Sequence, residues 1–234
     1  MPDTLSAIDI MPEQMRCELI SWPHFQRLAR KLALAIVESG FHPDLIVAIA
    51  RGGMAPARIV ADYLGIMNVV SFRIEHYRGS ERAPQAMIRN PLSTEITGRR
   101  VLLIDDVSDS GETFEMALRH LRERLPAAEV RTAALHHKIA SRYVPDYFAI
   151  RVLKWRWITY PWAVVEDLSG FIRAMEPRPT DVAAVTERLR RDHALKIRPC
   201  VVLDVLQLLD PIAYRNTAAP SLARRPHSAH TSTQ

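Results

Sequence analysis

Hydrophobic and polar residues follow helical and strand patterns from about residue 21 onward. Uninterrupted apolar runs such as 45–50 predict strands that are buried on both faces, as in parallel sheets. Apolar residues at helical spacing predict amphipathic helices, and Ser21 and Gly40 suit the start and the end of the first helix. The predicted strands cover 45–50, 69–74, 101–104 and 130–135, and the predicted helices cover 25–39, 54–64 and 113–125.

The order of these elements is strand, helix, strand, a long polar segment, and again strand, helix, strand. Such alternation predicts an α/β fold with a doubly wound, mainly parallel sheet. Residues 75–98 contain several glycines and prolines and show no sustained period, which predicts a long loop or a hairpin. Short stretches at 147–153 and 157–160 are further strand candidates, at the edge of the sheet or on a cap.

The chain is expected to have four parts. Residues 1–20 form an N-terminal segment with weak periodicity, and residues 21–175 form the main domain. Two helical patterns in 176–210, one charged and one apolar, predict a small helical appendage. Residues 211–234 are rich in Ala, Pro, Ser, Thr, His and Arg without an apolar period, and we expect them to be disordered.

Composition places the chain among ordinary globular proteins. Of its 234 residues, 48% are hydrophobic and 24% charged, and no apolar run is long enough for a membrane span. The first 15 residues do not resemble a signal peptide. Cys17 and Cys200 lie far apart and form no disulfide framework, so a cytoplasmic location is expected.

The net charge of +5 raises the question of nucleic acid as a partner. The basic residues are scattered along the chain, however, and several lie in the C-terminal segment that we expect to be disordered. A small phosphorylated substrate would equally favour a modestly basic protein. Nucleic-acid binding is therefore not favoured, although the charge alone leaves it open.

The segment 101–113 carries the most informative chemistry of the chain. An apolar strand leads to two adjacent carboxylates, Asp105 and Asp106, and ligands of open α/β sheets bind at the carboxyl ends of strands. Residues Ser110 to Thr113 then offer hydroxyls and backbone N–H groups at the start of a helix, where phosphate binds readily. Taken alone, the two carboxylates could also cap that helix. Together, the features indicate a sugar phosphate as ligand.

This segment resembles the phosphoribosyl-pyrophosphate (PRPP) motif of the type I phosphoribosyltransferases, and the resemblance extends over roughly residues 20–170. Residues 50–53 (Ala-Arg-Gly-Gly) are similar to the pyrophosphate loop of that family, although the turn by itself would be an ordinary one. Residues 73–98 stand where the family has its flexible catalytic loop, in which Tyr77, Arg78 and Arg82 could cover the substrate.

The resemblance implies a role for each matching residue. Asp105 and Asp106 would bind the ribose hydroxyls of PRPP, directly or through Mg²⁺, which prefers carboxylate and phosphate oxygens. The residues implied for the 5′-phosphate are Asp109, Ser110, Gly111, Glu112 and Thr113. Those implied for pyrophosphate are Arg51, Gly52 and Gly53, where glycine lets the backbone approach the ligand.

Within the family, Asp109 points to the 6-oxopurine salvage enzymes, in which it would act as the catalytic acid or base. Lys138 stands in the place of the lysine that contacts the 6-oxo group. Residues 157–162 (Trp-Ile-Thr-Tyr-Pro-Trp) resemble a segment of the microbial xanthine-guanine phosphoribosyltransferases. The base would thus be bound by Lys138, Trp157 and Ile158, although Ala163 departs from the acidic residue common in those enzymes.

The expected activity is transfer of the 5-phosphoribosyl group from PRPP to xanthine, guanine or hypoxanthine, with Mg²⁺ and with release of pyrophosphate. The resemblance also implies a homodimer or homotetramer. One alternative is a regulatory protein on the same fold that senses PRPP or a nucleotide; the combination of Asp109, Lys138 and Trp157 favours the enzyme. A phosphoribosyltransferase for another acceptor is a second alternative, left open by Ala163 and by the pair His76-Tyr77.

Overall fold

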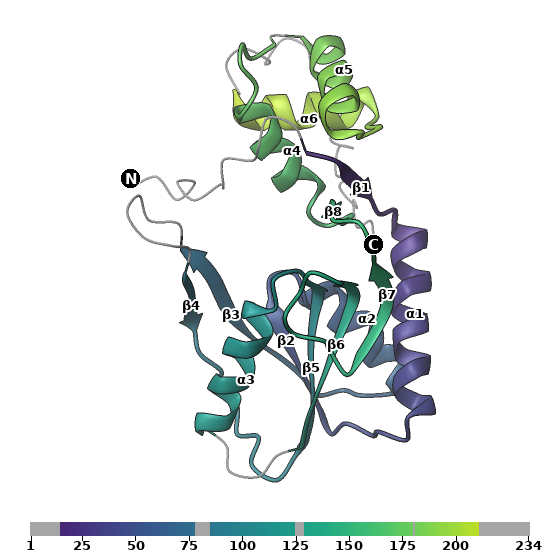
Figure 1. Cartoon of the computed structure of the whole chain (residues 1–234), viewed down its shortest axis with the longest axis vertical. Coiled ribbons are helices and arrows are strands. Elements are labelled where there is room, and N and C mark those ends of the chain that lie inside the picture. Colours follow the sequence, from purple (N-terminus) through teal and green to yellow (C-terminus); the bar gives the residue numbers. More distant parts are fainter. Residues whose placement is uncertain (1–14, 78–84, 125–128, 180, 211–234) are drawn as a thin grey trace, which may run out of the picture. The chain divides into compact units, whose positions relative to one another are not determined.

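The structure is a computed structural model that describes residues 15–77, 85–124, 129–179 and 181–210 (Figure 1). The predicted C-terminal tail and most of the predicted N-terminal segment lie outside these residues. The strands are β1 (Cys17–Leu19), β2 (Leu45–Ala50), β3 (Val69–Tyr77), β4 (Gln85–Asn90), β5 (Arg100–Ser108), β6 (Glu129–Lys138), β7 (Tyr147–Val152) and β8 (Trp157–Thr159). The helices are α1 (Trp22–Glu38), α2 (Met54–Leu64), α3 (Glu112–Arg124), α4 (Val164–Arg173), α5 (Val182–His193) and α6 (Pro199–Leu209).

The central sheet has the strand order β4-β3-β2-β5-β6-β7. The pairs β2–β3, β2–β5, β5–β6 and β6–β7 are parallel, and β3–β4 is an antiparallel hairpin. β1 and β8 form a separate two-stranded sheet. The expected α/β fold with a doubly wound, mainly parallel sheet is confirmed, and of the two alternatives for residues 75–98, a long loop or a hairpin, the structure has the hairpin of β3 and β4.

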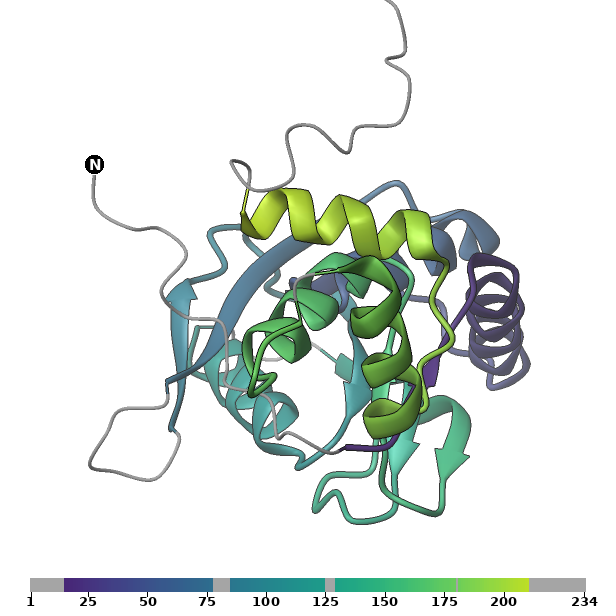
Figure 2. The same ribbon diagram turned by 90° about the horizontal axis from the view of Figure 1, so that it is seen from above.

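Helices cover both faces of the central sheet (Figures 1 and 2). Alternate residues of β2 and β5, such as Val47 and Leu103, pack with Phe114 and Leu121 of α3 in one core cluster. Ile46, Ala48, Leu102 and Ile104, which alternate with them, are also almost fully buried; α2 contacts β2 and β5, and α1 contacts β6 and β7. A sheet buried on both faces explains the continuous apolar runs of its strands.

Local signals in the sequence fix several boundaries. The hydroxyl of Ser21 accepts a hydrogen bond from the backbone N–H of His24 at the start of α1. Gly40 and Gly65 follow α1 and α2 in the left-handed conformation, with φ of +74° and +68°. β5, by contrast, continues to Ser108, past the predicted end at 104, because β6 pairs with it in register as far as Ser108.

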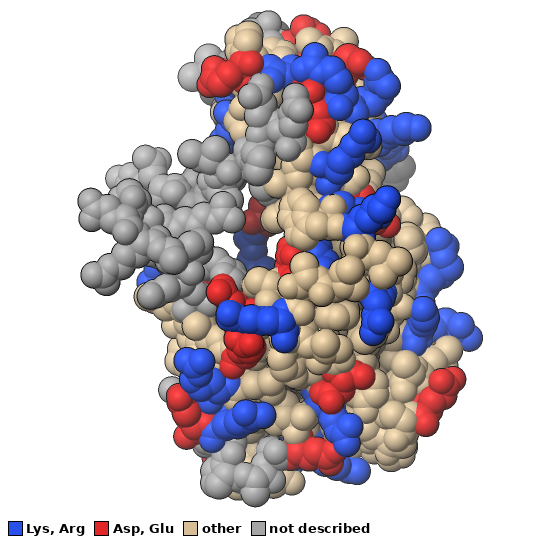
Figure 3. All heavy atoms as spheres, viewed as in Figure 1, with Lys and Arg blue, Asp and Glu red and all other residues tan. Residues whose placement is uncertain are grey.

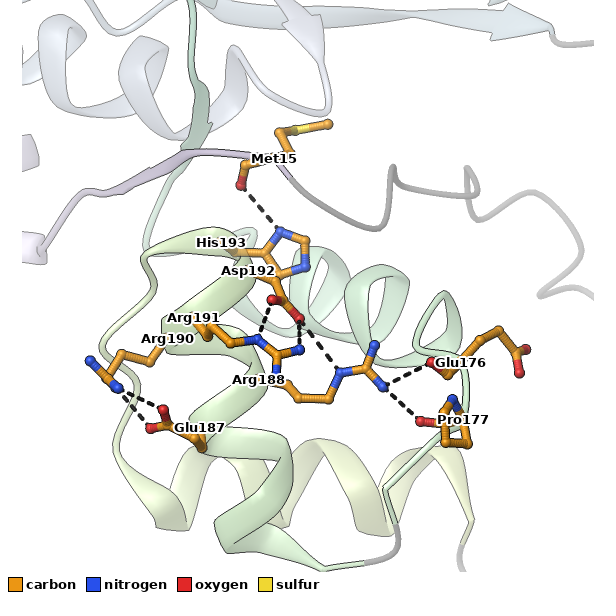
Figure 4. A network of polar contacts seen from close by, with 9 residues as sticks. All are labelled: Met15, Glu176, Pro177, Glu187, Arg188, Arg190, Arg191, Asp192 and His193. Carbon is orange, nitrogen blue, oxygen red and sulfur yellow. Dashed lines mark hydrogen bonds and ion pairs between the residues drawn. The ribbon is translucent and has the colours of Figure 1, made fainter.

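Contacts divide the chain into two units, one of residues 18–162 and one of residues 1–17 and 163–234. The second unit contains α4, α5 and α6, and α4 was not predicted from the sequence. In this unit the carboxylate of Asp192 pairs with Arg188 and Arg191, and Arg188 also donates hydrogen bonds to the carbonyls of Glu176 and Pro177 (Figure 4). These contacts tie α5 to the segment that follows α4.

Two surface properties bear on the class of protein. Across the face shown in Figure 3, Lys and Arg side chains are interspersed with Asp and Glu rather than gathered in one patch. Within the part of the chain that the structure describes, every helix falls short of the length and apolarity that crossing a bilayer demands.

Candidate active site

The candidate site lies where the strand order of the central sheet reverses. β2 is flanked by β3 on one side and β5 on the other, so the segments after β2 and β5 leave the sheet side by side. In open α/β sheets this position binds ligands. A cavity of about 300 Å³ opens here. Its lining includes nine residues predicted from the sequence, namely Arg51, Gly52, Asp105, Asp106, Asp109, Ser110, Gly111, Thr113 and Trp157.

Asp105 and Asp106 form an acidic pair inside the end of β5. Asp105 is only 7% exposed, and burial, followed by the charge of Asp106, raises its pKa well above the ordinary value. The backbone N–H of Asp106 donates a hydrogen bond of 2.9 Å to Oδ1 of Asp105. The fold therefore keeps an electrostatically unfavourable carboxylate at the cavity, which is typical of a functional site.

The turn after β2 fits closely against β5. A Cβ atom on Gly52 would lie 2.5 Å from Oδ2 of Asp106, and one on Gly53 would lie 2.3 Å from the carbonyl oxygen of Ile104. A side chain at position 53 would overlap the backbone, and one at position 52 would displace the carboxylate of Asp106, so glycine suits both positions. The peptide bond between Ala50 and Arg51 is cis. The predicted pyrophosphate loop thus lies directly beside the acidic pair.

The loop between β5 and α3 is held in a fixed shape. Gly111 has a φ of +93°, and a Cβ atom there would lie 2.7 Å from the backbone nitrogen of Tyr143. The buried hydroxyl of Ser108 donates to the carbonyl of Tyr143 at 2.9 Å. The hydroxyl of Ser110 accepts from the backbone N–H of Glu112 at 3.3 Å, where α3 begins. The loop therefore precedes a helix N-terminus that lies at the cavity, an arrangement that favours anions.

A second charged cluster joins the ends of β5 and β6. The ammonium group of Lys138 lies 2.6 Å from Oδ2 of Asp109, and the indole N–H of Trp155 donates to Oδ1 of Asp109 at 3.1 Å. The same ammonium lies 4.4 Å from the ring centre of Trp155, within the range of a cation–π contact. The side chain of Lys138 is 3% exposed and that of Asp109 is 39% exposed. Asp109 is thus accessible, whereas its cationic partner is buried.

The acidic pair also fits the chemistry of Mg²⁺. Among the described residues, no group of three or more His, Cys, Asp or Glu side chains could hold a metal ion without help. Mg²⁺, however, is usually bound by one or two carboxylates together with phosphate oxygens of the substrate. Asp105 and Asp106 offer such carboxylates at the cavity, and a cation would offset both the burial and the charge repulsion that raise the pKa of Asp105.

Some predicted residues lie elsewhere. Four of them do not line the cavity, namely Gly53, Glu112, Lys138 and Ile158. Lys138 still contacts the cavity residue Asp109, whereas Ile158 is buried in the middle of β8. Arg78 and Arg82 lie outside the described residues, and Tyr77 ends β3 with a side chain that is not described either. The roles predicted for these three loop residues stay predictions.

Sequence reasoning gave no role to three residues that the structure brings to this region. Trp155 contacts both Asp109 and Lys138, and the buried side chains of His136 and Tyr160 contact each other, with Tyr160 also bound to the backbone carbonyl of Asp106. One signal was available for His136. It precedes Lys138 by two positions in β6, and alternate residues of a strand share a face.

Comparison with known proteins agrees with this geometry. Residues 17–167, more than half of the chain, match the family described as phosphoribosyl transferase domain. The xanthine-guanine phosphoribosyltransferase of Cereibacter sphaeroides is 32% identical over 149 residues, which cover 61% of this chain and 84% of that protein.

Two solved structures show the same fold. The purine phosphoribosyltransferase from Pyrococcus horikoshii aligns with a TM-score of 0.56 and 30% identity, over 62% of this chain and 93% of that one. A protein of Neisseria gonorrhoeae described as hypothetical, with bound ppGpp, aligns with a TM-score of 0.56 and 27% identity, over 63% of this chain and 89% of that one. The chain therefore belongs to the phosphoribosyl transferase domain family, as the motifs at 50–53 and 101–113 predict.

Proposed function

We propose that this protein transfers the 5-phosphoribosyl group of PRPP to a 6-oxopurine, namely xanthine, guanine or hypoxanthine, and releases pyrophosphate. The observation that carries the proposal is that three groups of residues with complementary chemistry lie together at one cavity. These are the acidic pair Asp105-Asp106, the loop that precedes α3, and the pair of Asp109 with Lys138. The name of the Cereibacter sphaeroides relative supports the choice of base.

PRPP would occupy the part of the cavity between the ends of β2 and β5. The carboxylates of Asp105 and Asp106 would accept hydrogen bonds from the ribose hydroxyls. The backbone and hydroxyls of the loop from Ser110 to Thr113 would hold the 5′-phosphate at the start of α3. Gly52 lets the backbone approach the pyrophosphate, and Arg51 would offset part of its charge.

Asp105 and Asp106 would also hold Mg²⁺, directly or through water. When bound, the ion would stabilise the negative charge that develops on the departing pyrophosphate. The residues of this chain supply the remaining electrostatics: Arg51 and the N-terminus of α3 both favour anions at the cavity.

The purine would lie against Trp157, with its exocyclic oxygen near Lys138. The ammonium of Lys138 has three protons, so it can donate to the purine oxygen while it keeps its contact with Asp109. As the bond between C1 of the ribose and the purine nitrogen forms, the bond from C1 to pyrophosphate breaks. The carboxylate of Asp109 would accept the imidazole proton that the purine loses.

A nucleotide-binding regulator on the same fold is the second candidate. The structure of the Neisseria gonorrhoeae protein holds ppGpp, which shows that a relative of this fold binds a nucleotide. A regulator would bind PRPP or a nucleotide without turnover. The presence of Asp109, Lys138 and Trp157 in one region favours the enzyme.

Pyrophosphate release with PRPP, Mg²⁺ and a panel of bases tests the proposal. We expect turnover with at least one of xanthine, guanine and hypoxanthine, and little with adenine or orotate. Asp109→Asn should lower kcat by about 10²-fold or more, whereas Asp204→Asn, an exposed change on α6, should not. Nucleotide binding without turnover of any base would establish the regulator instead.

Two further properties remain part of the proposal. The fold family leads us to propose a homodimer or homotetramer, which size measurement in solution would test. We also propose a cytoplasmic location, because the two cysteines are far apart and form no disulfide framework. Fractionation of cells that produce the protein would test the location.

A further inference from the structure

A buried pair of polar side chains contacts the backbone of the acidic pair. It consists of His136 on β6 and Tyr160, which directly follows β8; they are 1% and 2% exposed. The hydroxyl of Tyr160 lies 2.8 Å from the backbone carbonyl of Asp106 and 2.8 Å from Nδ1 of His136. These two contacts connect three segments of the site through one buried oxygen atom.

The direction of both hydrogen bonds follows from the chemistry of the groups. A carbonyl oxygen can only accept, so the single hydroxyl proton of Tyr160 is donated to Asp106. The hydroxyl oxygen must then accept a proton from Nδ1 of His136. Nδ1 of His136 therefore bears a proton, and Nε2 has no hydrogen-bond partner among the described residues, which suits the neutral ring with its single proton on Nδ1.

The charge states of both groups agree with this assignment. Burial, with the charges of His24 and Lys138, lowers the pKa of His136 to about 4. Burial, with the charges of Asp106 and Asp105, raises the pKa of Tyr160 well above its ordinary value.

Aromatic packing fixes the ring of Tyr160. The ring of Trp162 stacks on it with ring centres 4.8 Å apart and an angle of 5° between the planes. Phe25 packs edge-on against Trp162, with ring centres 4.8 Å apart. The hydroxyl is therefore held in place by packing on one side and by His136 on the other. Such double support is what a site needs to keep a catalytic group in position.

We propose that Tyr160 and His136 are positioning residues that join the purine subsite to the PRPP subsite. This inference rests on the proposed function. Tyr160 is three residues after Trp157, and it fixes the backbone of Asp106. β8 itself pairs with β1 and not with the central sheet, so this hydroxyl is a direct polar link from the base segment to the acidic pair. His136 acts only through the hydroxyl of Tyr160.

Tyr160→Phe keeps the stacked ring and removes only the hydroxyl. We expect kcat/KM for both substrates to fall between about 10-fold and 100-fold, since small displacements of catalytic groups have effects of this size. Tyr147→Phe is the matched control, because it also removes one hydrogen-bonded hydroxyl, to Ser39 at 2.8 Å, but away from the cavity. Its kcat/KM should stay within twofold of the unmodified protein.

A double variant separates positioning from simple stability. In Tyr160→Phe the Nδ1–H of His136 is left buried without an acceptor, so adding His136→Phe should restore part of the lost Tm. The activity should not recover, because the carbonyl of Asp106 still lacks its donor. His136→Phe alone should reduce kcat/KM only a few-fold. Recovery of activity together with Tm would show that the role is merely structural and would overturn the inference.

Failure of the proposed function would be recognised separately. If the unmodified protein turns over no base, the same variants are compared by calorimetric titration with guanosine 5′-monophosphate, which carries both the base and the 5′-phosphate. If Tyr160 is a positioning residue, the affinity of Tyr160→Phe for this nucleotide should be at least tenfold weaker, and that of Tyr147→Phe should be unchanged. Equal affinity of both variants, or equal kcat/KM where turnover exists, would contradict the inference.

Discussion

The carboxylate of Asp109 contacts two hydrogen-bond donors of the site. One of its oxygens accepts from the buried ammonium of Lys138, and the other accepts from the indole N–H of Trp155. Its side chain is nevertheless partly accessible, at 39%. A carboxylate that is oriented by two donors and open to the cavity has the properties of an acid or base that exchanges a proton with a bound molecule.

The difference in burial between Lys138 and Asp109 predicts unequal effects on stability. Asp109→Asn leaves an ammonium that is 3% exposed without its carboxylate, and the free energy of unfolding should fall by about 3 kcal/mol. Lys138→Met leaves a carboxylate that water can reach, so its effect should be below about 1 kcal/mol. Chemical denaturation measures both values. Equal losses, or a larger loss for Lys138→Met, would show that the pair is not buried in this way.

Trp155 is predicted to support Asp109 and Lys138 in two separable ways. Trp155→Phe keeps an aromatic face for the ammonium and loses the N–H donor, whereas Trp155→Leu loses both. We expect kcat/KM for the purine to fall a few-fold for Phe and about tenfold or more for Leu, since each contact is worth about 1 kcal/mol. Leu153→Ala, an exposed neighbour, is the control. An unchanged kcat/KM in Trp155→Leu would remove Trp155 from the site.

At the scale of elements, the site depends on how closely the turn after β2 approaches β5. Gly52 faces a side chain, the carboxylate of Asp106, whereas Gly53 faces the backbone oxygens of Ile104 and Ile49. A side chain can move aside more easily than a backbone that belongs to two paired strands. The two glycines should therefore respond differently to the same substitution.

Gly53→Ala should lower the free energy of unfolding by more than about 2 kcal/mol, because the new methyl group would overlap the backbone. Gly52→Ala should be less destabilising but should raise KM for PRPP strongly, since it displaces the carboxylate of Asp106. Denaturation curves and initial rates measure the two effects. The same Tm for both variants, with an unchanged KM in Gly52→Ala, would contradict this view of the turn.

The lowered pKa of His136 on β6 predicts how the free energy of unfolding changes with pH. Its pKa is lowered from 6.5 to about 4, so between these values the unfolded chain binds a proton that the folded chain excludes. The free energy of unfolding should thus decrease as the pH falls from about 6.5 to about 4, by about 3 kcal/mol from this residue. His137 and His193 have lowered pKa values as well and add to the same trend.

His136→Phe removes only the contribution of His136 to this pH dependence. The free energy of unfolding of the variant should therefore depend less steeply on pH over this interval than that of the unmodified protein. Denaturation at a series of pH values measures the slope, and His42→Phe, at an exposed position, should leave it unchanged. Parallel curves for His136→Phe and the unmodified protein would mean that His136 is not kept neutral by burial.

Elements with a strong local pattern could be predicted from the sequence almost to the residue. β2 and α2 have the predicted bounds, since a continuous apolar run ends at Ala50 and a glycine follows Leu64. α4 was missed because Ser169 and Gly170 interrupt its apolar pattern, although its Leu168, Phe171 and Ile172 are buried. β5 was predicted too short because its length depends on pairing with β6, which is a tertiary effect.

The same limit applies to the site. The acidic pair and the loop before α3 lie on one continuous motif, so a strand-end argument could find them. The contacts of Trp155 with Asp109, and of Tyr160 with His136 and Asp106, join residues that are 24 to 54 positions apart. No local pattern encodes such contacts, because they depend on which strands become neighbours.

At the scale of the whole molecule, the candidate chemistry resides in one of the two units. All residues that line the cavity belong to residues 18–162, and the family match covers 17–167. α5 and α6 lie beyond that match, and Asp192 of α5 pairs with Arg188 and Arg191 of the same helix. We therefore assign the proposed synthesis of a nucleotide from PRPP and a 6-oxopurine to the first unit.

Mass spectrometry of the product tests that claim most directly. The protein is incubated with PRPP, Mg²⁺ and each of xanthine, guanine and hypoxanthine, and a parallel sample contains a chelator in place of the ion. We expect the matching nucleoside 5′-monophosphate and pyrophosphate in equal amounts for at least one base, and a loss of product with the chelator or with Asp109→Asn. Absence of a nucleotide product with all three bases, from a folded protein that binds PRPP, would contradict it.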